Sequence, residues 1–243
     1  MPHQLWLTEI LNRYFAMAVT AVLRHLGIEP QYPAAPITNT VAMELLVFVI
    51  LVMFFLFVRS RLSVEQPGGM QHIVEMLQEY VSGQASEIIG HGYERFVPFV
   101  MAIGYFILLS NLIGLIPGFE SPTAGIVVTL GCALCTFVYY HFHGLRHHGR
   151  HYIKQFLGPA PVLAPLMFVI EVISHLARIM SLSVRLFANM FAGDMLTLAF
   201  FSLFPLLLPV LFLALHLGVS IIQTFIFIML TMVYLGGAVG EEH

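Results

Sequence analysis

Long apolar runs separated by short polar connections dominate the chain. Five of the runs can cross a bilayer as helices, because about 20 apolar residues span its hydrocarbon core. They cover residues 41–58, 96–116, 126–142, 162–203 and 209–239. The pattern therefore predicts an all-α polytopic membrane protein, with about five transmembrane helices in one membrane domain, residues 41–243.

The last two runs are longer than a bilayer is thick. A helix over residues 162–203 rises by about 60 Å at 1.5 Å per residue, roughly twice the hydrocarbon thickness. Such a helix must tilt steeply, bend or lie partly in the interface. Since only the short PLLLP connection separates it from the final run, we expect the two to form a long, steeply tilted hairpin.

Two further segments are amphipathic. Residues 5–26 and 66–92 repeat apolar side chains at helical spacing, but charged residues are interleaved among them. Both are predicted to be helices that lie in the membrane interface. Gly27 ends the first, and the proline-rich stretch EPQYPAAP connects it to the first span. Residues 1–40 thus form an N-terminal interfacial segment and linker.

The composition excludes an ordinary soluble domain. Of the 243 residues, 59% are hydrophobic and 9% are charged, whereas about a quarter of the residues of a soluble domain are charged. No basic cluster interleaved with aromatic residues points to nucleic acid. The informative charges are therefore the few that lie inside the apolar runs.

One polar stripe follows the helix predicted over residues 162–203. At 100° per residue, the polar positions of this stripe fall within about 40° of Arg185. They are Glu171, Ser174, Arg178, Ser181, Arg185 and Asn189. An arginine near the bilayer centre costs roughly 3 kcal/mol, so this face must meet protein, water or a partner charge. Polar packing between helices is the alternative, but two arginines and a glutamate in line favour a functional site.

A second set of polar residues lies on and beside the final helix. His216 shares a face with three other polar positions, Ser220, Gln223 and Tyr234. A lone intramembrane histidine is usually a packing residue, but alignment with Gln223 favours a hydrogen-bonded relay. Asp194 points away from the stripe on its own helix. In a tight hairpin the final helix could bring His216 within hydrogen-bond reach of Asp194.

Three polar residues in the middle spans allow other interpretations. Asn111 is equally compatible with helix packing and with a proton pathway. Cys132 and Cys135 form a CxxC inside an apolar run. We interpret them as buried small side chains and not as a redox or metal site.

Histidines gather after the third span, together with basic residues. The set comprises His141, His143, His147, His148 and His151, with Arg146, Arg150 and Lys154. A histidine-rich segment can bind metal, but three cationic neighbours would repel the ion. We therefore predict a solvated basic loop over residues 143–158, with no metal and no cofactor.

The basic residues also predict the orientation. With five spans, six of them flank one side of the membrane: Arg59, Arg61, Arg95, Arg146, Arg150 and Lys154. Only Arg13 and Arg24 fall on the other side. Positive-inside bias then places the N-terminus outside and the C-terminus in the cytoplasm.

Several motifs together resemble one known family. SLSVRLFANMFAGD closely resembles the signature of subunit a of bacterial F-type ATP synthases, and Glu171 lies fourteen residues before its arginine. HLGVSIIQTFIFIMLTMVYL, SNLIGLIP and the terminal EEH extend the match. The resemblance implies a stator subunit of the bacterial inner membrane. Its partners would be a rotating ring of c subunits, the b subunits of the peripheral stalk and the rest of the complex.

The resemblance also implies roles in proton translocation, through two offset half-channels. Arg185 would oppose the ring carboxylate. The outer half-channel would be lined or bordered by Asn189, Asp194, His216, Gln223 and Asn111, and the inner one bordered by Glu171 and Ser181. The chain departs from the family at Asp194, which is more often Glu or His, and at Gly125, where many relatives carry an acidic residue or Asn. The subunit would be non-catalytic, with no nucleotide site of its own.

The chemistry of arginine agrees with this role. Its guanidinium is a very weak acid, so it pairs with a carboxylate but passes no proton along. A secondary ion or metal transporter that uses Arg185 and Glu171 as ligands is the alternative. Such a transporter is expected to contain internal repeats, and the two halves of this chain differ in length, charge and pattern. HExxH and GxSxG are absent, which argues against a hydrolase.

Overall fold

The computed structural model describes residues 5–25, 27, 29, 32, 34–63, 68–116, 118–149, 164–203 and 207–240. In these ranges the regular structure is entirely helical. The α-helices are α1 (Trp6–His25), α2 (Asn39–Ser60), α3 (Gly69–Ile88), α4 (Val97–Ile113), α5 (Ile126–His148), α7 (Ala164–Leu203) and α8 (Leu207–Val239). Two 3-10 turns, η1 (Tyr93–Arg95) and η2 (Pro122–Ala124), precede α4 and α5. The predicted all-α membrane fold is confirmed.

Each of the five predicted spans coincides with a helix. By length and composition α2, α5, α7 and α8 can cross a membrane, whereas α4 is apolar but has only 17 residues. At 1.5 Å per residue α4 rises by about 25 Å, somewhat less than the hydrocarbon core of about 30 Å. The amphipathic segments form α1 and α3, and their place in the membrane interface stays a prediction.

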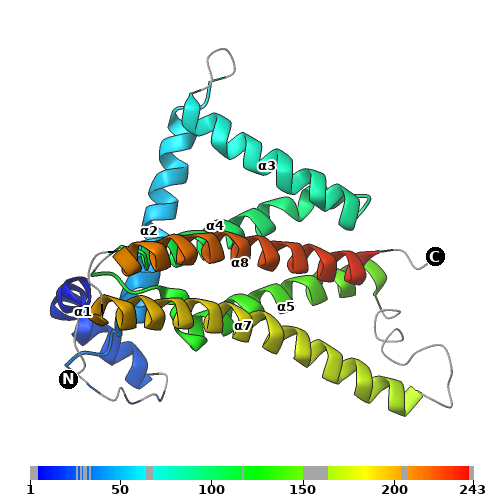
Figure 1. Ribbon diagram of the computed structural model, residues 1–243. Helices are drawn as coiled ribbons and strands as arrows, with labels where there is room; N and C mark the ends of the chain where they lie inside the picture. The colour runs from blue at the N-terminus through cyan, green and yellow to red at the C-terminus, as the bar shows by residue number, and fades with distance from the viewer. Residues whose placement is uncertain are drawn as a thin grey trace.

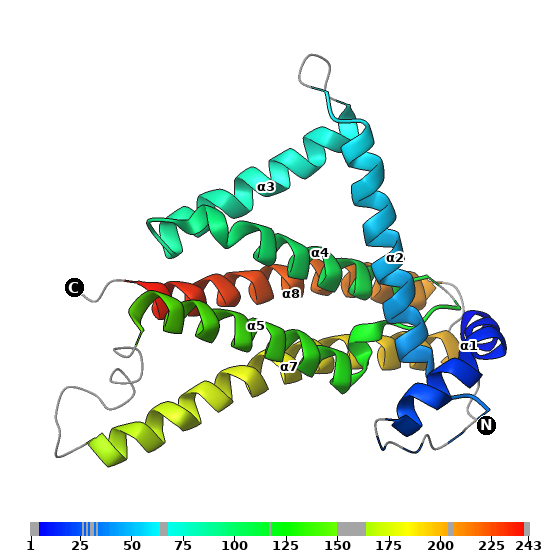
Figure 2. The same cartoon turned by 180° about the vertical axis from the view of Figure 1, so that it is seen from behind.

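Four helices run side by side, and α2 stands across them (Figures 1 and 2). The four are α4, α5, α7 and α8, and each contacts at least one of the others along its length. α7 and α8 form the expected antiparallel hairpin, and α7 curves away from its neighbours toward its amino end. α3 returns from the far end of α2 to pack on α4 and α8.

Two apolar cores hold the four helices together. One joins α7 to its neighbours through Leu182, Leu186 and Met190, which pack with Ile107 and Phe227. The other joins the carboxyl end of α8 to α3, α4 and α5. Gly236 allows the close approach of α3, because a Cβ at this position would lie 2.6 Å from the carbonyl oxygen of Ile88.

The prediction of a basic loop over residues 143–158 is wrong for its first six residues, 143–148. α5 continues to His148 and ends at Gly149, whose φ of 55° lies in the left-handed region and whose N–H donates to Leu145 O at 2.8 Å. Arg146, His147 and His148 occupy the last turn of α5, where positive charge stabilises the helix carbonyls. The remainder of the predicted loop, residues 150–158, lies outside the described residues.

The predicted burial of both cysteines is half right. Cys132 is buried, whereas Cys135 is exposed. α5 buries the face that carries Cys132, Ala133, Thr136 and Tyr140. A membrane helix is apolar all round, so hydrophobicity alone did not distinguish the protein-facing side from the lipid-facing side.

Candidate functional site

The polar stripe of α7 follows the border between a buried and an exposed face. Leu182, Leu186 and Met190 are buried on one side, and Met180 and Val184 are exposed on the other. None of the six stripe residues is buried within the chain. The stripe is therefore accessible to a partner while its helix is anchored in the core.

The bonded partner of Arg185 is a hydroxyl on its own helix. Its Nη2 donates to Ser181 Oγ at 3.0 Å, one helical turn earlier. Within the described residues, no carboxylate lies within ion-pair distance of Arg185. Because an unpaired arginine is costly in a membrane, the arrangement leaves this cation available to a partner.

Small side chains surround Arg185 on the exposed face of α7. They are Ala177, Ser181, Ala188 and Ala192, and all four are exposed. Small residues at such spacing let another helix approach closely in a membrane. The surface beside Arg185 thus fits a second helix that carries its own polar group.

One turn after Arg185, α7 and α8 are joined by a polar bond. Asn189 Nδ2 donates to Gln223 Oε1 at 2.6 Å, and Gln223 is buried. The two predicted stripes, one on each helix, therefore meet at this pair. The hairpin geometry brings together residues that are 34 positions apart in the sequence.

His216 and Asp194 also face each other across the hairpin. His216 Nδ1 lies 3.9 Å from Asp194 Oδ1, and the side chains are 3% and 26% exposed. The distance suits an ion pair but exceeds that of a direct hydrogen bond, which the sequence had led us to expect. Gly193 permits the approach, since a Cβ there would lie 2.9 Å from His216 Nε2.

A cavity opens beside this histidine. Its volume is about 200 Å³, and its lining includes His216, Asn189 and Gly193. His216 Nε2 is buried and has no hydrogen-bond partner among the described residues. The cavity has room for several water molecules, so a polar ring nitrogen and an aqueous space lie together. We call Asp194, His216, Asn189, Gln223 and this cavity the Asp194 cluster.

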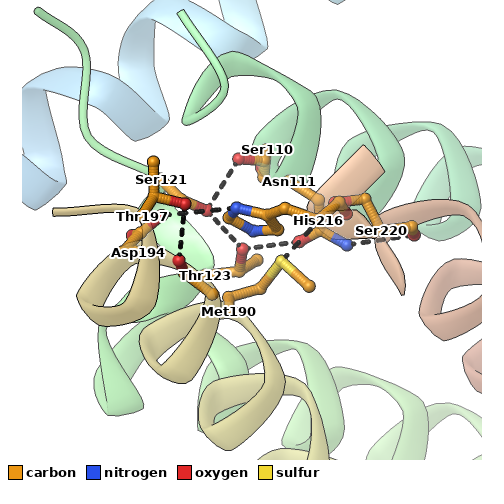
Figure 3. Close-up of polar contacts among 10 residues, drawn as sticks. Ser110, Asn111, Ser121, Thr123, Met190, Asp194, Thr197, His216 and Ser220 are labelled. Atoms are coloured by element: carbon orange, nitrogen blue, oxygen red, sulfur yellow. Dashed lines mark hydrogen bonds and ion pairs between the residues drawn. The ribbon is translucent and has the colours of Figure 1, made fainter. Parts of the chain in front are cut away.

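Behind His216, polar side chains tie α4, α8 and η2 together (Figure 3). Asn111 Nδ2 donates to Ser220 O at 3.4 Å, and Thr123 Oγ1 donates to Asn111 Oδ1 at 2.6 Å. Ser220 Oγ donates to His216 O at 2.8 Å. Asn111 is fully buried, and its contacts support the backbone that positions His216.

Glu120 adds a carboxylate near the Asp194 cluster. It accepts a hydrogen bond from Asn39 Nδ2 at 3.1 Å, and its charge acts on Asp194. The helical periodicity that marked the other polar residues gave Glu120 no role. The available signal was its position as the single acidic residue in the turn PGFESPTAG between two spans, the same turn that carries Gly125.

A second polar cluster lies toward the amino end of α7. His175 Nε2 lies 3.2 Å from Glu171 Oε1, and His175 Nδ1 lies 3.1 Å from the Tyr140 hydroxyl on α5. We call Glu171, His175 and Tyr140 the His175 cluster. Sequence reasoning assigned Glu171 alone, although His175 follows it by one helical turn.

Arg185 lies between the two clusters on α7. Glu171 precedes it by about 21 Å along the helix and Asp194 follows it by about 14 Å, at 1.5 Å per residue. Of the predicted site residues, Ser181 contacts Arg185, and Asn189, Asp194, His216 and Gln223 gather beyond it, with Asn111 behind them. The described residues contain no group of three His, Cys, Asp or Glu side chains that could hold a metal ion.

Comparison with known proteins finds relatives that all carry the same description. A family model described as the ATP synthase A chain matches residues 41–236. ATP synthase subunit a of Koribacter versatilis (strain Ellin345) is 57% identical over 100% of both chains. ATP synthase subunit a of Solibacter usitatus (strain Ellin6076) is 44% identical over 96% of this chain and 100% of its own length. That of Geotalea uraniireducens (strain Rf4) is 45% identical over 73% and 77%.

Proposed function

Because the chain belongs to the ATP synthase A chain family, and is thus a membrane subunit of an F-type ATP synthase, we propose that it carries protons to and from a ring of c subunits through two half-channels that Arg185 separates. The position of Arg185 carries the proposal. It has no carboxylate partner among the described residues, and it lies between two polar clusters. Membership of this family argues against the alternative hypothesis of a secondary ion or metal transporter.

The fixed charge of Arg185 makes it a partition. A guanidinium attracts an ionised carboxylate and accepts no proton from it. A ring carboxylate gives up its proton on one side of Arg185, passes it in the ionised state and takes up a proton on the other side. Each proton that crosses 100 mV releases roughly 2.3 kcal/mol, and repeated steps drive rotation.

The c ring docks on the exposed face of α7. The small side chains at Ala177, Ser181, Ala188 and Ala192 are exposed around Arg185, so helices of the ring can slide past at close range. The b subunits of the peripheral stalk and the rest of the complex are the other partners.

The two clusters serve opposite sides of the bacterial inner membrane. The Asp194 cluster, with Asn111 behind it, borders the outer half-channel, and Glu171 and Ser181 border the inner one. Positive-inside bias supports this orientation, since Arg59, Arg95 and the basic end of α5 flank the cytoplasmic side. The subunit itself performs no nucleotide chemistry.

Replacement of Arg185 tests the proposal. Lysine loses its proton readily when buried, so Arg185→Lys is expected to abolish ATP synthesis in the assembled complex. Arg185→Ala is expected to do the same and, in membrane vesicles stripped of the catalytic head, to leak protons passively. Co-purification of the complex confirms assembly in both cases. If either variant still synthesises ATP, the proposal is wrong and helix packing explains the polar stripe.

A further inference from the structure

His175 is bonded on both sides by groups that can exchange a proton. Its Nε2 contacts the Glu171 carboxylate at 3.2 Å and its Nδ1 contacts the Tyr140 hydroxyl at 3.1 Å. His175 is 8% exposed and Tyr140 is 2% exposed, whereas the Glu171 side chain is 37% exposed. The chain of contacts therefore leads from an accessible carboxylate into the buried interface of α5 and α7.

The inner end of this chain of contacts meets a small cavity. Its volume is about 10 Å³, the room of one water molecule, and Tyr140, Thr136, Arg178 and Tyr234 take part in its lining. Thr136 is 2% exposed, and its Oγ1 has no hydrogen-bond partner among the described residues. A buried hydroxyl without a partner is costly, and a water in this cavity would satisfy it.

Charged and titratable groups from three helices face His175 and Tyr140. α7 contributes Glu171 and Arg178, and α5 contributes His141, whose ring centroid lies 4.7 Å from that of His175. α8 contributes Tyr234, over whose ring Arg178 Cζ lies at 5.4 Å. Arg178 thus places a fixed positive charge at the cavity.

We infer that His175 and Tyr140 carry protons between the cavity water and Glu171. They would form the proton wire of the half-channel on the Glu171 side of Arg185. The inference rests on the proposed function and specifies its inner path. In the resting arrangement the Tyr140 hydroxyl donates to Nδ1 of His175, and the Nε2 proton is held toward Glu171.

One transfer moves three protons by one bond each. A proton that leaves the ring carboxylate reaches the cavity water, and this water gives a proton to Tyr140 Oη while the Tyr140 proton passes to His175 Nδ1. The Nε2 proton passes to the Glu171 carboxylate, which releases it to the aqueous phase. One proton enters and one leaves, and no electrons are transferred.

The test uses the assembled complex in membrane vesicles. ATP-driven acidification is measured first, and passive proton flux is then measured after removal of the catalytic head, with the pH varied on each side in turn. The variants are His175→Gln, which keeps a hydrogen-bonding side chain, and Tyr140→Phe, which keeps the ring. The matched control is His143→Gln, because His143 also lies on α5 but packs on Phe96 and Tyr139.

Both cluster variants are expected to lower the flux on the order of tenfold. This is less than the factor of about 10² to 10⁴ that a positioned acid or base contributes, because water can partly replace the lost group. The dependence of the flux on pH should change only when the pH is varied on the side of the membrane that Glu171 faces. The control should conduct as the unaltered protein does.

Two results would overturn the inference. If His175→Gln and Tyr140→Phe conduct like the unaltered protein with the same pH dependence on each side, the wire is wrong while the proposed function stands. If the control loses flux to the same extent, the effect is one of packing at the end of α5. Vesicles with the unaltered protein that conduct no protons would instead contradict the proposed function itself.

Discussion

Gly193 controls how closely His216 approaches α7. A Cβ at this position would lie 2.9 Å from two ring atoms of His216, closer than real Cβ contacts. Gly193→Ala therefore displaces the imidazole from the cavity, and a shift of about 1 Å can cost up to about 100-fold in a reaction that depends on geometry. We expect proton pumping at least several-fold slower in the assembled complex. Gly218→Ala is the control, since nothing lies within 4 Å of its added methyl, and equal pumping by both variants would contradict the prediction.

Asp194 and His216 are expected to act in one path. Asp194→Leu and His216→Leu should each slow ATP-driven proton pumping without dissociating the complex. Because residues that act as a unit give non-additive losses, the double variant should pump about as slowly as the slower single variant. Pumping is followed by the quenching of a pH-sensitive dye in inverted vesicles. Normal pumping by both single variants would show that the pair lies outside the path.

Sequence periodicity predicted which residues share a face of one helix, but not which residues meet across helices. Glu171 and Arg185 could be placed on one stripe because they belong to α7. The contact of His175 with Tyr140 joins α7 to α5 across 35 positions, and no periodic pattern encodes it. Asp194 and His216 could be paired in advance because a short connection fixes the hairpin to which both belong.

At the scale of elements, the long hairpin is the main feature. α7 has 40 residues and α8 has 33, and near their connected ends Phe200 and Phe212 stack with ring centroids 4.1 Å apart. Apolar run length was sufficient to predict these helices, and the motifs that they carry predicted the family. The end of α5 was mispredicted because histidine and arginine read as loop residues, although they suit the last turn of a helix.

The contact of α3 with α8 depends on Gly236. An added methyl would lie 2.6 Å from the Ile88 carbonyl oxygen, and backbone moves only at a cost. Gly236→Ala is expected to destabilise the packed subunit by about 1–3 kcal/mol, as overpacking does. The measurement is the midpoint of thermal dissociation of the purified complex. Gly237→Ala is the control, since its methyl meets open space, and an equal midpoint for both variants would contradict this account.

At the scale of the whole molecule, α2 stands across the four helices that carry the site (Figure 2). If α2 follows the bilayer normal, α7 and α8 must be strongly inclined, as their length requires. Crossing angles of this kind could not be predicted from the sequence, because packing between helices sets them. The number of apolar runs did, however, predict the architecture.

The distribution of basic residues predicts where the termini lie. A tag at His243 should be accessible to an impermeant reagent from the cytoplasmic side alone, and a tag at Met1 from the outside alone. The reagent is applied to intact cells and to inverted vesicles in parallel. Labelling of both termini from the same side would contradict the five-span orientation.

The cavity beside His216 has an electrical consequence. Water conducts ions and the packed helices do not, so a water-filled cavity takes the potential of the solution to which it connects. Under the proposed function, in which Glu171 borders the other half-channel, the membrane voltage falls between the cavity and the Glu171 side chain, and not evenly across the lipid. A charge that travels sideways past Arg185 experiences this whole voltage in a single step, which at 100 mV is worth roughly 2.3 kcal/mol. The field that does the work thus points largely along the membrane plane, in the direction in which a ring would turn.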